Sequence, residues 1–195
     1  LYRAKGLDFL NLLNGMYAGA IFDKQKRKLI LFRDRFGIKP LYYTQWENHF
    51  AFSSEVKPLL KCRKQLAVLN TSRIPAFFSY RYVPGEETMF QGIKRLLPGH
   101  FLEYDLDTGT FRVEQYWEYR LDRINAGLSL GQASEEFYRL FQDAVKIRLR
   151  SDVEVGCLLS GGIDSSAVAS QVARSNPSGK LFTMAFEEAN YNELP

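Results

Sequence analysis

Residues 158–166, with the sequence LLSGGIDSS, constrain the fold of this 195-residue chain more than any other segment. They join an apolar stretch at residues 153–159, which predicts a buried strand, to small residues at 164–174, which predict a helix. Two glycines at the junction allow the chain to turn tightly. A second apolar stretch at residues 181–186 follows the helix. Strand, helix and strand in this order predict a βαβ unit with a parallel sheet that is buried on both faces.

The turn of this unit carries groups suited to binding phosphate. The first amides of a helix have no partner within the helix, and the helix dipole makes that end partly positive. We therefore expect backbone amides and the hydroxyls of Ser160, Ser165 and Ser166 to surround a phosphate or pyrophosphate. Asp164 alone would repel phosphate, but a Mg²⁺ ion that bridges its carboxylate and the phosphate oxygens would remove the repulsion. The simpler alternative is an ordinary βα turn in which Asp164 caps the helix; a Walker A loop is excluded because Gly-Lys-Ser/Thr is absent.

The first 120 residues have a different character, because short apolar segments alternate with turns. Four segments are predicted to be consecutive strands of one antiparallel meander, at residues 16–23, 29–34, 41–46 and 50–54. A further hairpin is predicted at residues 101–119, around a turn at 107–110. A helix from Ser129 to about Arg150 follows a linker, and Gln132, three residues after Ser129, predicts a capping box.

These patterns predict two domains of different fold class. Residues 1–122 are expected to form an α+β domain with antiparallel sheets, and residues 128–195 an α/β domain with a parallel sheet. The composition, with 46% hydrophobic and 25% charged residues, is that of a globular protein and excludes a disordered chain, a collagen and a coiled-coil rod.

Charge, hydropathy and cysteine spacing argue against several kinds of partner and site. Twenty-six Lys and Arg against 22 Asp and Glu give a net charge of +4, which is too small and too dispersed to indicate a nucleic-acid partner. No apolar run reaches the ~18 residues of a membrane span, so no membrane partner and a cytoplasmic location are expected. Cys62 and Cys157 lack both Cys-x-x-Cys spacing and a nearby His, which argues against a disulfide framework and a zinc site.

Several longer segments together resemble glutamine-dependent asparagine synthetases. LNGMYAGAIFD, FRDRFGIKPLYY and FAFSSEVKPLL resemble the second half of a class II, N-terminal-nucleophile-type glutaminase domain. YVPGEETMFQGIKRLLPGHFLEYD resembles the connection that follows it. SDVEVGCLLSGGIDSSAVAS resembles the start of the synthetase domain, an ATP pyrophosphatase with an adenine nucleotide alpha hydrolase-like fold. The order and spacing of these segments extend the resemblance over nearly the whole chain.

The resemblance implies a two-step enzyme with small-molecule substrates, namely aspartate, glutamine and ATP. One site would hydrolyse glutamine to ammonia, and the other would use ATP and Mg²⁺ to adenylate the aspartate side chain. Ammonia would then displace AMP and give asparagine. A homodimer is the oligomeric state that we consider first.

The ATP-binding residues that the resemblance implies are Leu159, Ser160, Gly161, Gly162, Asp164, Ser165 and Met184. Asp164 is also the implied Mg²⁺ ligand. For Leu159 and Met184, which are expected at the ends of the two parallel strands, the alternative is a place in the sheet core. Gly19 lies where relatives commonly have a bulky aromatic residue, so we expect a gap in the first sheet.

The resemblance also implies that no catalytic residue lies within these residues. The glutaminase nucleophile of the family is an N-terminal Cys, a role that Cys62 and Cys157 cannot fill from mid-chain. The chain starts at Leu1 and ends at Pro195, so we expect a truncated, inactive part of a longer protein.

Three alternatives stay open at this point. The first is a related amidotransferase that adenylates another carboxylate, in β-lactam formation or peptide amidation. The second is an RNA-modifying pyrophosphatase, for which Lys146, Arg148 and Arg150 would be the basic patch; the solvated side of an amphipathic helix explains these residues better. The third is a non-catalytic remnant that binds nucleotide or a partner protein.

Overall fold

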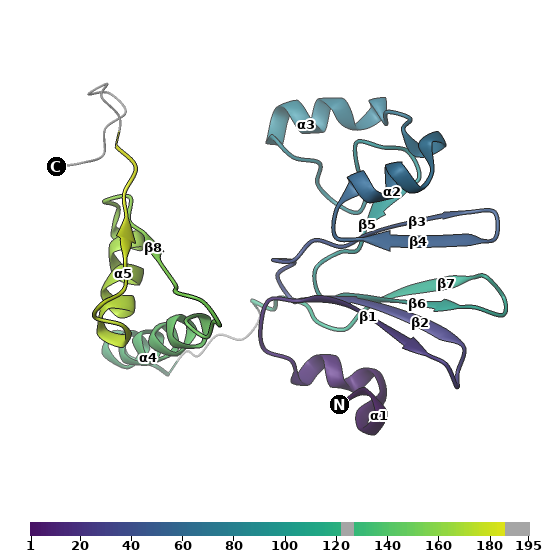
Figure 1. Ribbon diagram of the computed structural model, residues 1–195. Helices are drawn as coiled ribbons and strands as arrows, with labels where there is room; N and C mark the ends of the chain where they lie inside the picture. Colours follow the sequence, from purple (N-terminus) through teal and green to yellow (C-terminus); the bar gives the residue numbers. More distant parts are fainter. Residues whose placement is uncertain (122–126, 186–195) are drawn as a thin grey trace. The chain divides into compact units, whose positions relative to one another are not determined.

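The computed structural model describes residues 1–121 and 127–185 of the chain (Figure 1). The chain divides into two compact units, Leu1–Leu121 and Asp122–Pro195. Each unit has apolar clusters of its own, so each is described separately. Among the described residues, no helix is both long enough and apolar enough to cross a membrane.

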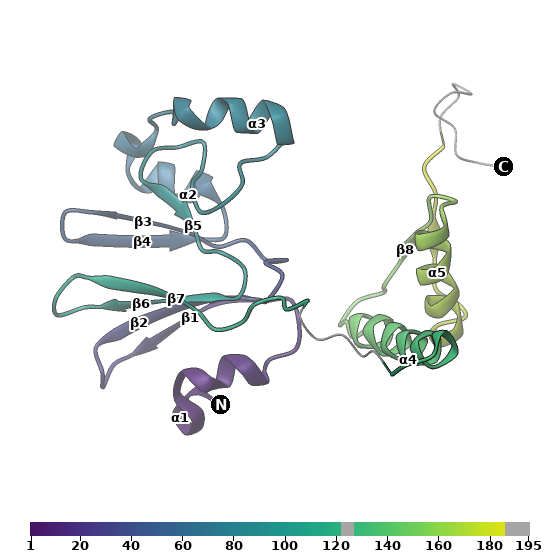
Figure 2. The ribbon, with the colours of Figure 1, turned by 180° about the vertical axis from the view of Figure 1, so that it is seen from behind.

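Unit 1 contains two antiparallel sheets (Figures 1 and 2). The first has the order β1-β2-β6-β7, with strands at Ala18–Asp23, Lys28–Arg33, His100–Asp105 and Phe111–Gln115. The second has the order β4-β3-β5, with strands at His49–Ser53, Tyr42–Trp46 and Ile93–Arg95. The predicted hairpin at residues 101–119 is confirmed as β6 and β7, paired with Leu102 opposite Val113.

The predicted single meander is wrong, because its four strands belong to two sheets. β1 and β2 form a hairpin in the first sheet, whereas β3 and β4 form a hairpin in the second. The free edge of β2 pairs instead with β6, which places Leu31 opposite Leu102. A strand from 70 residues further along the chain therefore takes the place that the sequence pattern assigned to β3.

The two sheets face one another and have helices on their outer sides. Leu31 and Leu102 from the first sheet and Tyr43 from the second belong to one buried cluster, which joins the sheets. The outer face of the first sheet is covered by α1 (Tyr2–Lys5) and the 3₁₀ helix η1 (Gly6–Leu12), through Phe9 and Leu10. The second sheet is covered by α2 (Val56–Cys62), through Leu59. The remaining short helices are η2 (Lys64–Leu66), η3 (Thr71–Arg73) and α3 (Ile74–Tyr80).

A buried polar junction follows β2 and turns the chain out of the first sheet. Asp34 is buried, with 1% exposure. Its carboxylate accepts four backbone hydrogen bonds at 2.9–3.2 Å, from the amides of Tyr17, Phe36, Ile38 and Lys39. The Arg33 guanidinium donates to the carbonyls of Gly37, Lys39 and Leu96 at 2.6–2.7 Å. Burial, and then the neighbouring Arg95, lower the pKa of Arg33. Arg33 and Asp34 are themselves buried, and they supply hydrogen-bond partners to the backbone carbonyls and amides of the turn that follows β2.

The expected gap at Gly19 is absent. Gly19 lies opposite Phe32 in the β1–β2 register, and the Phe32 ring lies over it, with its Cζ 2.5 Å from where a Cβ of residue 19 would be. Phe9 packs edge-on against the same ring, with centroids 5.3 Å apart. The aromatic group is therefore supplied by the neighbouring strand, which covers the glycine.

Gly19→Ala is expected to destabilise unit 1 by about 1–3 kcal/mol, because the new methyl group would displace a ring that Phe9 holds in place. Gly131→Ala is the control: its Cβ would meet only Ser129 Oγ at 4.0 Å, and alanine favours the helix that contains it. Urea unfolding followed by tryptophan fluorescence measures unit 1, since Trp46 and Trp117 are the two tryptophans of the chain, and far-UV circular dichroism measures the helices of unit 2, which contain Gly131. Equal stability of Gly19→Ala and the unaltered chain would contradict the packing described.

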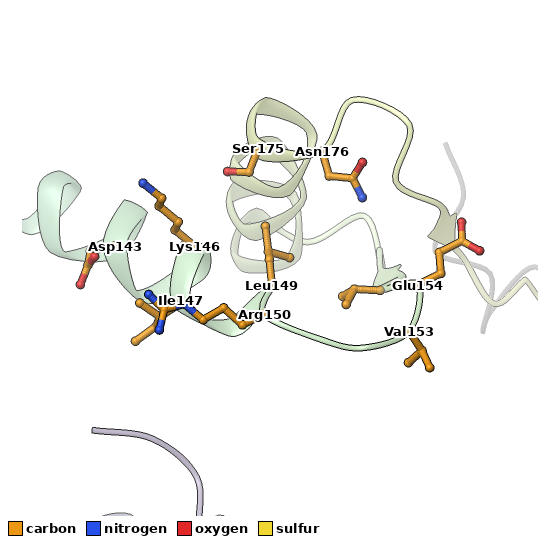
Figure 3. Close-up of a pocket in the computed structure, with 10 residues that line it drawn as sticks. Asp143, Lys146, Ile147, Leu149, Arg150, Val153, Glu154, Ser175 and Asn176 are labelled. Atoms are coloured by element: carbon orange, nitrogen blue, oxygen red, sulfur yellow. The ribbon is translucent and has the colours of Figure 1, made fainter. Parts of the chain in front are cut away.

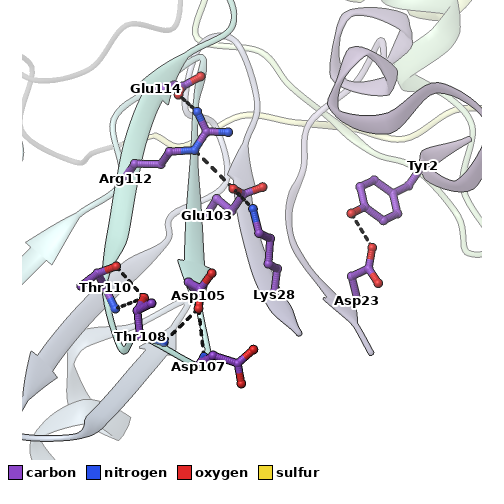
Figure 4. A network of polar contacts seen from close by, with 10 residues as sticks. All are labelled: Tyr2, Asp23, Lys28, Glu103, Asp105, Asp107, Thr108, Thr110, Arg112 and Glu114. Carbon is purple, nitrogen blue, oxygen red and sulfur yellow. Dashed lines mark hydrogen bonds and ion pairs between the residues drawn. The ribbon is translucent and has the colours of Figure 1, made fainter. Parts of the chain in front are cut away.

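Charged side chains of β2, β6 and β7 form a polar network on the first sheet (Figure 4). Glu103, in β6, accepts hydrogen bonds from Lys28 at 2.6 Å and from Arg112 at 3.3 Å, and Arg112 also pairs with Glu114. Burial would raise the pKa of Glu103, but the two cations outweigh it and the pKa is lowered. Glu103 therefore favours the folded state in its charged form.

The contribution of Glu103 to stability is expected to disappear in acid. Because its folded pKa lies below the unfolded value of about 4.5, the contribution is present above that pH and is lost as the pH falls through the folded pKa. Glu103→Gln should therefore lower the free energy of unfolding at pH 7 and have little effect at pH 2.5. Chemical unfolding of both proteins at the two pH values tests this expectation. A Gln variant that loses as much stability in acid as at pH 7 would rule out the ionic cause.

Unit 2 begins with a long helix and continues as a βαβ unit. α4 (Leu130–Arg148) is preceded by Ser129, and the predicted capping box with Gln132 is confirmed. β8 (Cys157–Leu158), α5 (Ile163–Ser175) and β9 (Leu181–Phe182) follow, and β8 pairs with β9 in parallel. The strands are shorter than predicted. Leu158 is 80% exposed and Phe182 55% exposed, so the sheet is not buried on both faces within the described residues.

Candidate functional site

The LLSGGIDSS segment forms the turn between β8 and α5. Gly161 has a φ of 83°, a left-handed conformation that only glycine adopts without strain. Gly162 is the N-cap of α5, and its carbonyl accepts the first helical hydrogen bond, from Ser166 N at 3.0 Å. The two glycines therefore have different roles: Gly161 reverses the chain, and Gly162 starts the helix.

The serines of this loop hold it together. Ser165 Oγ accepts a hydrogen bond from Ser160 N at 3.2 Å and donates one to the Gly162 carbonyl at 3.0 Å. The hydroxyls of Ser160 and Ser165 lie 3.1 Å apart. Five of the seven predicted ATP-binding residues therefore lie together in one loop and the first helical turn: Ser160, Gly161, Gly162, Asp164 and Ser165.

The loop leaves donors and one carboxylate open to solvent. Within the described part of the chain, the amides of Ile163, Asp164 and Ser165 have no hydrogen-bond acceptor, because they precede the first helical bond. Asp164 is exposed in this first turn. The described residues contain no cluster of three or more His, Cys, Asp or Glu side chains that could hold a metal, and Asp164 is the acidic residue in the first turn of α5. A Mg²⁺ ion held by one carboxylate and by phosphate oxygens fits this arrangement.

Leu159 and Met184, the other two predicted residues, lie at the carboxyl edge of the parallel pair. Leu159 N donates to Phe182 O at 2.9 Å, and its half-buried side chain packs against the apolar cluster under α5. Met184 lies two residues beyond β9 and is 76% exposed. Leu159 thus contributes to the core, whereas the Met184 side chain is free beside the same edge of the sheet.

A pocket of about 670 Å³ lies at the other end of α5 (Figure 3). Its lining includes Lys146 and Arg150 from the end of α4, Ser175 and Asn176 from the end of α5, and Glu154. None of the predicted ATP-binding residues lines it. The loop site and this pocket are therefore separate features of unit 2.

Sequence analysis did not predict the side-chain hydrogen bonds that join α5 to α4. Gln171 and Arg174 both donate to the hydroxyl of Tyr138 in α4, at 3.1 and 2.6 Å. Helical periodicity indicates which residues of a helix are apolar, but it does not pair a polar residue of one helix with a polar residue of another. Nothing in the local sequence could therefore have identified this contact.

Two known protein families match consecutive segments of the chain, in the same order as the sequence motifs. Residues 1–117 match the family model described as a glutamine amidotransferase domain. Residues 136–195 match the family model described as asparagine synthase.

Curated relatives match over nearly the whole chain. A putative glutamine-hydrolysing asparagine synthetase 2 of Methanocaldococcus jannaschii is 36% identical over 198 aligned positions, covering 100% of this chain and 38% of that protein. The glutamine-hydrolysing asparagine synthetase 2 of Bacillus subtilis is 36% identical, over 87% of this chain and 24% of that protein. The amidase chyE of Penicillium rubens is also 36% identical, over 96% of this chain and 30% of that protein. The chain thus spans 24–38% of the length of these relatives.

The first unit, with its facing antiparallel sheets, is a glutamine amidotransferase domain. The segment that matches asparagine synthase follows this unit in the same chain. The chain belongs to the glutamine-dependent asparagine synthetase family. The family resemblance that the sequence motifs predicted is confirmed.

Proposed function

We propose that the protein containing this chain makes asparagine from aspartate, with glutamine as nitrogen donor and ATP as energy source. The observation that carries the proposal is the loop at residues 159–165, with its open amides and the exposed Asp164, in a segment that matches asparagine synthase. The names of relatives that align with 100% and 87% of the chain support the same substrate class.

In this proposal the loop binds the pyrophosphate portion of ATP. The free amides of Ile163, Asp164 and Ser165 and the hydroxyl of Ser160 would donate to phosphate oxygens. Mg²⁺, when bound, offsets the charge that develops on the departing pyrophosphate. Asp164 would hold the ion, and Leu159 and Met184 would contact the nucleotide from the carboxyl edge of β8 and β9. The parallel pair β8–β9 would then be part of an ATP-pyrophosphatase domain over residues 128–195, following the glutaminase domain over residues 1–122.

Adenylation explains why ATP is needed. The aspartate side-chain carboxylate has no good leaving group, whereas β-aspartyl-AMP loses AMP readily when ammonia attacks. The proposed overall reaction converts aspartate, glutamine, ATP and water into asparagine, glutamate, AMP and pyrophosphate. We place it in the cytoplasm, where these small molecules are present, and a homodimer is the assembly to test first by sedimentation.

One alternative has a specific observation in its favour. Two fungal relatives are named amidases, chyE and chry2, at 36% and 31% identity. Adenylation of a different carboxylate by the same loop is therefore the second candidate function.

The test uses the native protein isolated from its source, incubated with Mg-ATP and glutamine. Aspartate should be required for release of AMP and pyrophosphate, and asparagine should form in equal amount. AMP release with another carboxylic acid but not with aspartate would favour the amidase alternative. Release of ADP, or of no nucleotide product with any acid, would overturn both proposals.

A further inference from the structure

Helix α5, which follows the loop, contacts α4 through a small network of side-chain hydrogen bonds. Gln171 Nε2 donates to Tyr138 Oη at 3.1 Å, and Gln142 Nε2 donates to Gln171 Oε1 at 3.4 Å. Arg174 Nη1 donates to the same Tyr138 hydroxyl at 2.6 Å. Both polar atoms of the Gln171 side chain therefore have a partner on α4.

Among the described residues of this contact, Gln171 is the polar side chain that is buried, with 6% exposure. Around it the α4–α5 packing is apolar, with Val145, Ala169 and Val172 in one buried cluster. A buried amide costs free energy unless it is hydrogen-bonded, so an apolar residue of similar size would pack here without that penalty. The side-chain amide of Gln171 has both of its hydrogen-bond partners, Tyr138 and Gln142, in one register of α5 against α4. A shift of α5 by one helical turn, about 5.4 Å, would move the amide away from both partners.

We propose that Gln171 is a positioning residue for the loop. Through Tyr138 and Gln142 it fixes the register of α5 on α4, and so fixes where the amides of Ile163 and Asp164 present themselves to a phosphate. Gln171 lies about 12 Å along the helix from the first turn, so it has no contact with the nucleotide. The inference rests on the proposed nucleotide binding by this loop.

Two substitutions remove the network from opposite sides while they conserve shape. Gln171→Met and Tyr138→Phe are each expected to weaken Mg-ATP binding to the full native protein by about 5- to 10-fold, measured by titration calorimetry, because the loop amides lose their fixed position. The thermal midpoint should stay within a few degrees, since packing volume is kept. The double variant should lose less affinity than the sum of the two single losses, because both substitutions remove the hydrogen bond between Gln171 and Tyr138. Gln25→Met and Tyr119→Phe, at exposed positions in unit 1, are the matched controls.

Hydrogen exchange in the absence of nucleotide tests the positioning separately from binding. The Ser166 amide, which donates to Gly162 O, should exchange several-fold faster in Gln171→Met and unchanged in Gln25→Met. If the unaltered protein binds no Mg-ATP but Ser166 exchange responds, the proposed function fails and the positioning role stands. Unchanged exchange at Ser166, or Mg-ATP binding by Gln171→Met as tight as that of the unaltered protein, would overturn the inference.

Discussion

Asp34→Ala is expected to destabilise unit 1 by about 3–5 kcal/mol. Four backbone amides would lose their acceptor, because the buried Asp34 carboxylate accepts from all of them. The buried guanidinium of Arg33 would also lose a nearby negative charge that favours its ionised form. Tryptophan fluorescence during urea unfolding reports the loss, since both tryptophans lie in unit 1.

Asp107→Ala is the matched control for this change. Its carboxylate, in the exposed turn between β6 and β7, pairs with Arg27, and both side chains are about 60% exposed. Exposed ion pairs contribute about 0–1 kcal/mol, so the control should lose little stability. A loss for Asp34→Ala no larger than that of the control would show that the turn after β2 is held by something other than the carboxylate.

The parts of the fold that sequence predicted correctly depend on neighbouring residues. The capping box at Ser129 and Gln132 and the hairpin of β6 and β7 are set within a few residues of the chain. The Ser-Gly-Gly-x-Asp-Ser loop is local in the same way, so five of its predicted residues lie together.

The parts that were wrong or missed depend on distant residues. The single meander fails because β6, about 70 residues after β2, takes the free edge of that strand. The gap expected at Gly19 is filled by Phe32 from the opposite strand. The Arg33 side chain finds one of its acceptors at Leu96, and Gln171 finds its partners on another helix. Sequence periodicity indicates which residues of a strand or helix are apolar, but the partner of each residue follows from long-range pairing.

Asp164→Asn should weaken binding of Mg-ATP about 100-fold, because the described loop offers Mg²⁺ a single carboxylate. The opposite sign is expected for ATP without metal. Next to the phosphate site the charged carboxylate repels the nucleotide, so its replacement by a neutral amide should strengthen binding of metal-free ATP by a few-fold. Calorimetric titration of the native protein with ATP, in excess Mg²⁺ and in EDTA, measures both effects.

This reversal of sign separates the two roles that the sequence allows for Asp164. Asp164 does not cap the helix, because Gly162 is the N-cap of α5 and no side chain caps it. A purely structural Asp164 in the first turn would make Asp164→Asn nearly silent and would change both affinities alike. Asp152→Asn, exposed in the same unit, controls for the loss of one negative charge. If Asp164→Asn lowers both affinities by the same factor, the carboxylate holds no Mg²⁺, and the loop binds phosphate through its amides alone. If only the Mg²⁺-dependent affinity falls, the exposed position of Asp164 beside three open amides is explained by the ion that it shares with the nucleotide.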